Sequence, residues 1–305
     1  MKIVDPFVVT DATLLSSNIV EPDAGIGLYA AGATYALGDY VIVLSTHHKY
    51  RSLQDGNIGQ DPVTDSALPT PLWWTDYGMD NRWRMFDQSI TSQSTNADSI
   101  EVVVTPVGQI VDSAVFLNVS ASSARVQVTD AVDGLVFDQT YDLTADSGIL
   151  DWYDYFFAPI VRNQNLAVGG LPLYMSAVIT LTLLDAGATV ACGAAVVGLS
   201  QNLGDSQYGA QLGIQDYSVK QVDAFGNYTI LERAFSKRGL FDLWVPAEYT
   251  SELQRLLEKY RATPIIYIGT DVHAATVFYG FYKDFTINIR YMEVSVCSLE
   301  IEGLT

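Results

Sequence analysis

Short runs of β-forming residues separated by turn residues dominate the middle of this chain, and they exclude a helical fold for it. Between Ile100 and Leu203, the runs IEVVVTP, SAVFLNVS, ARVQVTD and VITLTLLD each have the length of one strand, and DGL, DSG and GG separate them. No useful length of this stretch repeats apolar residues with a helical period. Many short strands at near-regular spacing predict an all-β sandwich over residues 96–205, of the jelly-roll or lectin type.

The last third of the chain, residues 209–305, combines strands with one clear helix. IQDYSVKQV and NYTILERAF indicate two strands joined by a turn at Gly226. Between Pro246 and Pro264 the apolar residues recur every three or four positions, which predicts a helix with one apolar stripe made of Leu253, Leu256, Leu257 and Tyr260. Three more strands follow, in PIIYIG, TVFYGFYKDFTINIRY and EVSVCSLEI. The pattern predicts an α+β sandwich.

The first 92 residues are expected to form an extended N-terminal arm, residues 1–25, and then a small β module, residues 26–92. In the module a turn at Gly38 and Asp39 precedes the β-rich run YVIVL, and a second strand runs through Tyr50. PLWWTDYG supplies a last, aromatic strand, and the polar stretch QSTNADS ends the module. A chain of 305 residues is long enough for several such domains, so we predict a mainly β, multi-domain protein.

Acidic residues outnumber basic residues by 35 to 16, which gives a formal net charge of −19. Proteins that bind nucleic acids present basic residues to the phosphates, so specific nucleic-acid binding is not expected. Anionic membranes attract basic segments, so this chain is not expected at their surface either. The acidic excess indicates a well-solvated surface, or one that repels DNA passing nearby.

The sequence also predicts neither membrane insertion nor secretion. The start, MKIVDPFVVTDAT, lacks the long apolar run of a signal peptide. The longest apolar stretch, residues 186–199, is too short and too rich in glycine to span a bilayer. Cys192 and Cys297 lie in apolar runs, so we expect two buried thiols and neither a disulfide nor a metal pair.

Catalysis has little support in the sequence. The three histidines, His47, His48 and His273, are not part of any recognisable nucleophile or metal motif. DGNIGQD, residues 55–61, begins like a calcium-binding loop but lacks the glutamate that such a loop needs at its twelfth position. In DWYDYFF, Asp151 and Asp154 leave a glycosidase-like carboxylate pair open, beside a lectin edge or a buried aspartate cap. We expect no enzyme, no metal site and no cofactor.

Carbohydrate binding has more support, because aromatic residues of the N-terminal module lie close to acidic and amide residues in the sequence. Sugar sites place an aromatic face against the sugar ring and use Asp, Asn or Gln for its hydroxyl groups. The candidate residues are Tyr35, Tyr50, Trp73, Trp74, Tyr77, Asp55 and Asn57. A module this small also needs large side chains for its own core, so core packing is the competing role for each tryptophan.

One motif in the module matches a known pattern, Tyr-x-x-Gly-Asp-x-Val followed by a tyrosine, a proline and two tryptophans. The matching residues are Tyr35, Gly38, Asp39, Val41, Tyr50, Pro62, Trp73 and Trp74. In this motif the module resembles the small chitin- and cellulose-binding modules of bacterial hydrolases. The resemblance implies that one of Trp73 and Trp74 packs in the core while the other faces sugar. Trp83 is expected to pack the module against the next domain.

Segments along nearly the whole chain, from VTDATLLSSNIVE near its start to YGFYKDF and SLEIEGL near its end, carry a second resemblance. Together they are similar to a group of tailed-phage virion proteins that are encoded among tail genes and labelled as carbohydrate-binding or minor tail proteins. The resemblance implies a structural subunit of the tail tip or baseplate, located in the virion. Residues 209–305 also resemble, in element order, the tail-tube and distal-tail modules that build rings by joining sheets between subunits.

Two hypotheses follow. In the first, a distal-tail-like protein forms a homo-oligomeric ring with copies of itself. It contacts the tail tube, hub and fibres and presents its N-terminal module and middle sandwich outward, to neighbours or to host glycans. The alternative is a receptor-binding adhesin that recognises a host cell-surface polysaccharide. A third, enzymatic hypothesis would have Asp151 or Asp154 cleave a polysaccharide.

Overall fold

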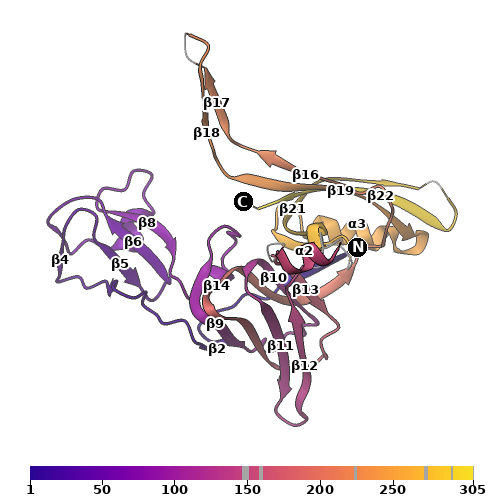
Figure 1. Cartoon of the computed structure of the whole chain (residues 1–305), viewed down its shortest axis with the longest axis horizontal. Coiled ribbons are helices and arrows are strands. Elements are labelled where there is room, and N and C mark those ends of the chain that lie inside the picture. Colours follow the sequence, from indigo (N-terminus) through magenta and orange to yellow (C-terminus); the bar gives the residue numbers. More distant parts are fainter. Residues whose placement is uncertain (146–150, 158–160, 223–224, 271–273, 290, 305) are drawn as a thin grey trace.

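The computed structural model describes residues 1–145, 151–157, 161–222, 225–270, 274–289 and 291–304, and it shows a mainly β protein in three parts (Figure 1). We name these parts the N-terminal module (26–92), the central body (93–202) and the C-terminal body (203–304). The prediction of a mainly β chain is confirmed. In the described ranges, no helix has the length and apolar character needed to cross a membrane.

The long strand β14 (Val178–Asn202) organises the central body. Its first part pairs with β11 and its second part with β10, while β9 follows most of its length. The other strands extend these pairings, with β12 on β11, β13 on β10 and β2 on β9. The bounds are β2 (Leu14–Ser17), β9 (Ser94–Val104), β10 (Ser113–Ser120), β11 (Ser123–Asp130), β12 (Gly134–Asp142) and β13 (Leu166–Gly169).

The strands of the central body alternate buried and exposed side chains, as their sequence patterns predict. In β11, Val126 and Val128 are buried in the core, while Arg125 and Gln127 alternate with them and are only partly buried. Arg125 pairs with Asp138 on β12. This two-residue period arises because successive side chains of a strand point to opposite faces of the sheet. Cys192 is buried in the same core, and burial raises its thiol pKa to about 12.

The N-terminal strand β1 (Lys2–Pro6) joins the central body to the C-terminal body. One edge of β1 pairs with β14 and the other with β20 (Ile265–Ile268), so a single sheet runs through both bodies. Ile3 and Val4 are fully buried, in two different apolar clusters on the two sides of this sheet. Residues 2–6 are therefore an interior strand of the sheet.

The C-terminal body continues the sheet in the order β20-β21-β22-β19, and β19 also pairs with β15 and β16. The remaining bounds are β15 (Asp205–Ser206), β16 (Gln211–Asp216), β19 (Phe235–Pro246), β21 (Val277–Asn288) and β22 (Val294–Gly303). The free thiol Cys297 lies in the core between these strands.

The predicted helix is confirmed as α3 (Thr250–Lys259), which follows the single 3-10 turn η2 (Ala247–Tyr249). Leu253, Leu257 and Tyr260 are buried in the core of the C-terminal body and Leu256 packs against it, as the apolar stripe predicts. The short 3-10 turn η3 (Ala274–Thr276) precedes β21.

The N-terminal module contains the sheet β3-β5-β6-β8 and the small ribbon β4-β7. Its bounds are β3 (Gly27–Leu28), β4 (Thr34–Tyr35), β5 (Tyr40–Val43), β6 (His48–Ser52), β7 (Asn57–Ile58) and β8 (Trp74–Met79). The predicted strands of YVIVL, Tyr50 and WWTDYG are thus present. The sequence reading missed α1 (Pro62–Ser66), although Asp61 caps it and Pro62 begins it. The 3-10 turn η1 (Arg84–Phe86) follows the module's last strand.

Two further elements lie outside the main sheet. The hairpin of β17 (Val219–Val222) and β18 (Tyr228–Leu231), which we name the arm, projects away from the C-terminal body (Figure 1). Its strands pair with each other and with no other strand of the described chain. DWYDYFF forms the short helix α2 (Trp152–Phe157) and not a sheet edge.

Gly198 tests the importance of the β1 junction. Glycine is required there because a Cβ atom would lie 2.1 Å from the Asp5 carbonyl oxygen. That oxygen belongs to the backbone of β1, so relieving the clash would require the strand to move. We expect Gly198→Ala to lower the free energy of unfolding by about 1–3 kcal/mol, as overpacking does in dense interiors. Urea denaturation measures this loss.

Gly213→Ala is the matched control, because Gly213 also lies in a strand but has open space where its Cβ would be. It should change the unfolding free energy by less than about 0.5 kcal/mol. Equal effects of the two variants would contradict a close approach of β1 to β14.

Candidate functional site

The N-terminal module uses Trp74 for its core. The indole is fully buried with Val41 and Tyr50, and its N–H donates to the Gln60 carbonyl oxygen at 2.9 Å. The Tyr35 ring meets Trp74 edge to face at a centroid distance of 5.2 Å. Tyr50 also lies inward, with its hydroxyl 3.3 Å from that of Thr46. Three of the predicted sugar-binding residues therefore lie together as packing partners.

Loop hydrogen bonds hold the other predicted polar residues. The buried Asn57 amide donates to the Ser52 hydroxyl and to the Trp73 carbonyl oxygen, and the Asp55 carboxylate accepts from the Leu37 N–H at 2.8 Å. Trp73 itself is partly buried against the core. Asn57 and Asp55 thus close the module's own loops, and the candidate residues do not converge on one exposed site.

Tyr77 is a predicted sugar-binding residue that is exposed to solvent. Its exposed fraction is 56%, and it lies on the opposite face of the sheet from Trp74. It meets Tyr40 edge to face at 5.3 Å, and the Lys49 ammonium lies 5.5 Å from the Tyr77 ring centroid. The Arg51 guanidinium lies 5.9 Å from the Tyr40 ring centroid. We name this group the tyrosine face. Tyr40, Lys49 and Arg51 were not among the sequence candidates, although the alternation of β5 and β6 places them opposite the core.

A cluster of charged residues joins the N-terminal module to residues 19–23, whose Ile19 packs in the central core. Glu21, 6% exposed, accepts hydrogen bonds from Arg82 and from the Trp83 indole, and lies 2.7 Å from His47 Nδ1. The rings of His47 and Trp83 stack at 4.0 Å, and Trp83 also meets Phe86, which packs against the central core. Trp83 therefore packs the module against the next part of the chain, as the sequence predicts.

The Asp80 carboxyl group in this cluster holds a proton near neutral pH. It is fully buried, and burial together with the neighbouring Glu21 carboxylate raises its pKa to about 7. Asp80 Oδ1 accepts from the Trp83 N–H, whereas Oδ2 meets no donor and gains a partner only when it is protonated toward Glu21. Burial also acts on Glu21, but hydrogen bonds from His47 and other donors outweigh it and lower the pKa of Glu21.

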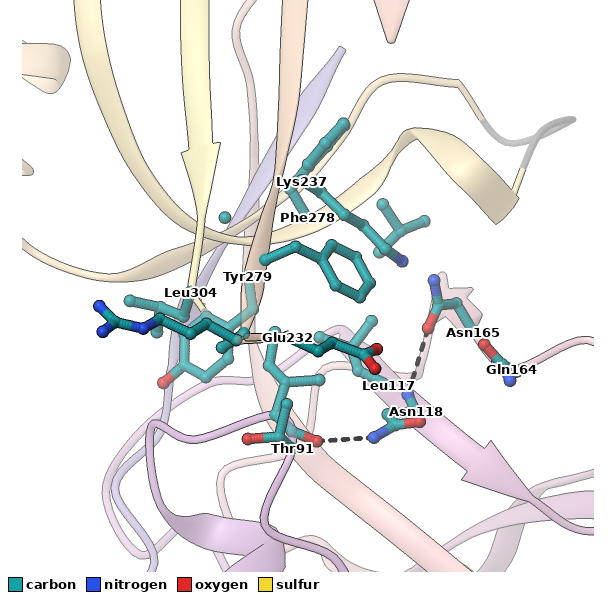
Figure 2. Close-up of a pocket in the computed structure, with 16 residues that line it drawn as sticks. Thr91, Leu117, Asn118, Gln164, Asn165, Glu232, Lys237, Phe278, Tyr279 and Leu304 are labelled. Atoms are coloured by element: carbon teal, nitrogen blue, oxygen red, sulfur yellow. Dashed lines mark hydrogen bonds between the residues drawn. The ribbon is translucent and has the colours of Figure 1, made fainter. Parts of the chain in front are cut away.

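A pocket of about 360 Å³ lies where the central and C-terminal bodies meet (Figure 2). Leu117 on β10 and Phe278 on β21 form its apolar floor, and both are buried. Figure 2 shows Asn118 and Asn165 on the central-body side and Glu232 and Lys237 on the other. The sequence did not predict this pocket, because its lining residues come from six separate segments and share no motif.

The aromatic side chains of α2 are all exposed. Trp152, Tyr153, Tyr155, Phe156 and Phe157 lie on the surface, with Trp152 79% exposed. Asp151 is exposed as well, so it is not the buried cap that the sequence left open, and the Asp154 side chain falls outside the described residues. Across the described part of the chain, no three His, Cys, Asp or Glu residues are grouped to hold a metal ion.

Comparisons with known proteins give no family for this chain. A scan against protein-family models finds no match, and a search of curated proteins finds no relative.

The buried Asp80 proton has a consequence for stability that pH titration measures. Because the pKa is raised from 3.8 to about 7 on folding, the folded state holds an extra proton between these values. Stability from this group is full below pH 4 and is lost as the pH rises through 7, by a few kcal/mol at about 1.4 kcal/mol per pKa unit. We expect Asp80→Asn, which mimics the protonated acid, to gain stability relative to wild type over that range.

Asp138→Asn is the opposite control. The hydrogen bond from Arg125 lowers the pKa of Asp138, so that pair stabilises the fold above the ordinary aspartate pKa and weakens in acid. Urea midpoints from pH 4 to 8 should therefore rise relative to wild type with increasing pH for Asp80→Asn. Asp138→Asn should differ from wild type by an amount that stays constant over this range, because Asp138 is ionised throughout it. The charged groups that act on Asp80, namely Glu21 and Asp23, are unchanged in Asp80→Asn, so the difference from wild type isolates Asp80. A difference for Asp80→Asn that does not vary with pH would contradict the shared proton.

Proposed function

We propose that this protein is a structural virion subunit of a phage tail tip or baseplate that assembles into a homo-oligomeric ring. Its partners would be further copies of itself and neighbouring tube, hub and fibre proteins. The proposal rests on the arm, a two-stranded hairpin of the kind that is only marginally stable in water on its own. The terminal motifs noted in the sequence support the same assignment.

The arm exposes a row of apolar side chains. Val222, Tyr228 and Ile230 are each 62% exposed, and the strand register places them on one face together with Lys220. Lys220 covers part of that face, with its ammonium 4.3 Å from the Tyr228 ring centroid. An isolated two-stranded hairpin is marginally stable in water unless its apolar face is covered. A second copy of the chain would provide that cover.

Ring closure also needs a second, different surface on each copy, because a head-to-tail contact joins two unlike patches. The turn between β21 and β22 lies at the end of the C-terminal body far from the arm (Figure 1). There a hollow of about 500 Å³ is lined by Trp244, Tyr291 and Met292, which are all more than half exposed. Two exposed apolar surfaces at opposite ends of one body suit a heterologous ring.

The finer fold assignments belong to this proposal. We assign the central body to the β-sandwiches of jelly-roll or lectin type, and the C-terminal body to the tail-tube and distal-tail modules. The assignment of the C-terminal body rests on its order of two ribbons, one helix and three strands. We also assign the N-terminal module to the small carbohydrate-binding modules, on its sequence motif.

A receptor-binding adhesin is the second candidate, and the tyrosine face is the observation that favours it. Tyr40 and Tyr77 present aromatic surface beside two cations, on a module that lies apart from the C-terminal body (Figure 1). Such a face suits stacking against a sugar ring of a host polysaccharide. The candidate residues Trp74, Tyr50 and Asn57 would then support the site from within the module.

The arm provides the test of assembly. Replacing Tyr228 and Ile230 together by aspartate puts two charges on the face that a second copy would cover. We expect sedimentation velocity to show an oligomer for wild type and a folded monomer for the double variant, with folding checked by circular dichroism. Val132→Asp is the control, since Val132 is 89% exposed at the β11–β12 turn and should leave assembly unchanged. A wild-type chain that stays monomeric at high concentration would contradict the ring.

The adhesin hypothesis has its own test. Tyr77→Ala should abolish binding to host-cell polysaccharide on a glycan array while leaving the melting temperature unchanged, because Tyr77 is exposed. Trp74→Ala removes a fully buried indole and should cost about 3–5 kcal/mol of stability. If wild type binds neither the array nor host cells, the adhesin hypothesis fails.

A further inference from the structure

The pocket between the central and C-terminal bodies has the dimensions and lining of a small-molecule site. Its volume of about 360 Å³ lies in the range of ligand pockets, which are mostly apolar with a few placed polar groups. Leu117, Val277 and Phe278 are buried side chains that form an apolar floor. Polar side chains surround the opening, namely Thr91, Asn118, Gln164, Glu232 and Lys237.

Lys237 is the lining residue that points most directly to a ligand. Its ammonium makes no hydrogen bond or ion pair with any residue in the described ranges, although acidic residues outnumber basic ones about two to one in this chain. The surrounding protein also desolvates it, and this burial lowers its pKa, as expected for a cation that lacks an anion. Lys237 is nevertheless an exposed residue overall, so its side chain is accessible to a ligand entering the pocket.

Asn118 gives the pocket a fixed polar wall. Its side-chain amide donates to the Ile90 carbonyl oxygen at 2.8 Å, and its backbone N–H donates to Asn165 Oδ1 at 3.2 Å (Figure 2). Gln93 in turn donates to the Asn118 carbonyl oxygen at 2.8 Å. Because these bonds hold the wall in place, a ligand would meet groups whose ordering cost has already been met by folding.

Glu232 restricts what the ligand can be. Its side chain lines the same pocket as Lys237 and Asn118 (Figure 2). A ligand that carried only negative charge would be repelled by Glu232, whereas a hydroxyl group could donate a hydrogen bond to it. The pocket thus suits a molecule with a carboxylate at one end, for Lys237, and hydroxyl groups at the other, for Glu232 and the side-chain amides.

We propose that this pocket binds a small hydroxylated carboxylate of the sugar-acid class, with the carboxylate on Lys237 and the hydroxyl groups on Glu232 and Asn118. The site lies outside the tyrosine face and does not depend on ring assembly. Its test is therefore independent of the tests of the proposed function. The same chemistry is present in a free sugar acid and in a uronic acid at the end of a polysaccharide chain.

Saturation-transfer NMR titrations of the full chain with glucuronate, glucose and benzoate test the site. Glucuronate should bind saturably, and glucose, which lacks the carboxylate, should bind at least about 10-fold more weakly, since a charge-assisted hydrogen bond contributes about that factor. Benzoate, which lacks the hydroxyl groups, should also be weaker. Equal binding of glucose and glucuronate, or no saturable glucuronate binding up to about 10 mM, would overturn the proposal.

Variants assign the binding to this pocket. Lys237→Gln should weaken glucuronate binding about 10-fold or more, while Lys237→Arg, which keeps the charge, should retain most of it. Ala234→Trp fills the pocket and should abolish binding by a route that does not involve charge. Lys220→Gln on the arm is the matched control and should bind as wild type does. Unchanged binding in both Lys237→Gln and Ala234→Trp would overturn the assignment.

A polysaccharide of glucuronate units distinguishes the two sources of the ligand. If the polymer competes with free glucuronate in wild type and not in Lys237→Gln, the pocket accepts a chain end, which supports the site. If free glucuronate alone binds, the site takes a free acid, which supports it equally. Competition by the polymer that persists in Lys237→Gln and in Ala234→Trp would place its binding elsewhere and count against the pocket.

Discussion

The structure depends on one constraint, which is that a buried strand must find hydrogen-bond partners on both of its edges. β1 meets this requirement by pairing with β14 on one side and β20 on the other, and it thereby makes one sheet out of two bodies. Gly198 permits the close approach of β1 to β14. Because backbone ladders on both edges fix the two bodies relative to each other, the pocket between them has a defined shape.

The charged cluster at Glu21 and Asp80 holds the N-terminal module through contacts between side chains and not through backbone pairing. A carboxyl pair that shares a proton is sensitive to pH, whereas the ladder at β1 is not. The contact between the N-terminal module and residues 19–23 is therefore expected to weaken as the pH rises, whereas the strand pairing at β1 is not. The proposed roles match this difference. The ring would be built by the C-terminal body, which is held by strand pairing, and recognition would be the role of the N-terminal module, which is held by the charged cluster.

Periodic elements were predictable from the sequence, and contacts between distant segments were not. The leucine stripe of α3 and the alternation of β11 are local patterns that the sequence displays directly. By contrast, the arm is exposed because no other strand of the described chain pairs with it, and no local pattern encodes this. The resemblance to sugar-binding modules implied that one tryptophan of the pair packs inward, and Trp74 is buried. The predicted sugar contacts Asp55 and Asn57 instead form hydrogen bonds within the module's own loops. Asp80, Tyr40 and Lys237 gain their properties from residues far away in the sequence.

The central claim is that copies of this chain cover one another's exposed arm in a closed ring. Electron microscopy of the purified protein tests it most directly, because class averages show the number and arrangement of copies without any assumption about partners. The account predicts ring-shaped particles of one size, with rotational symmetry and the C-terminal bodies in contact. Single separate particles at every concentration, or open fibres without closure, would contradict it.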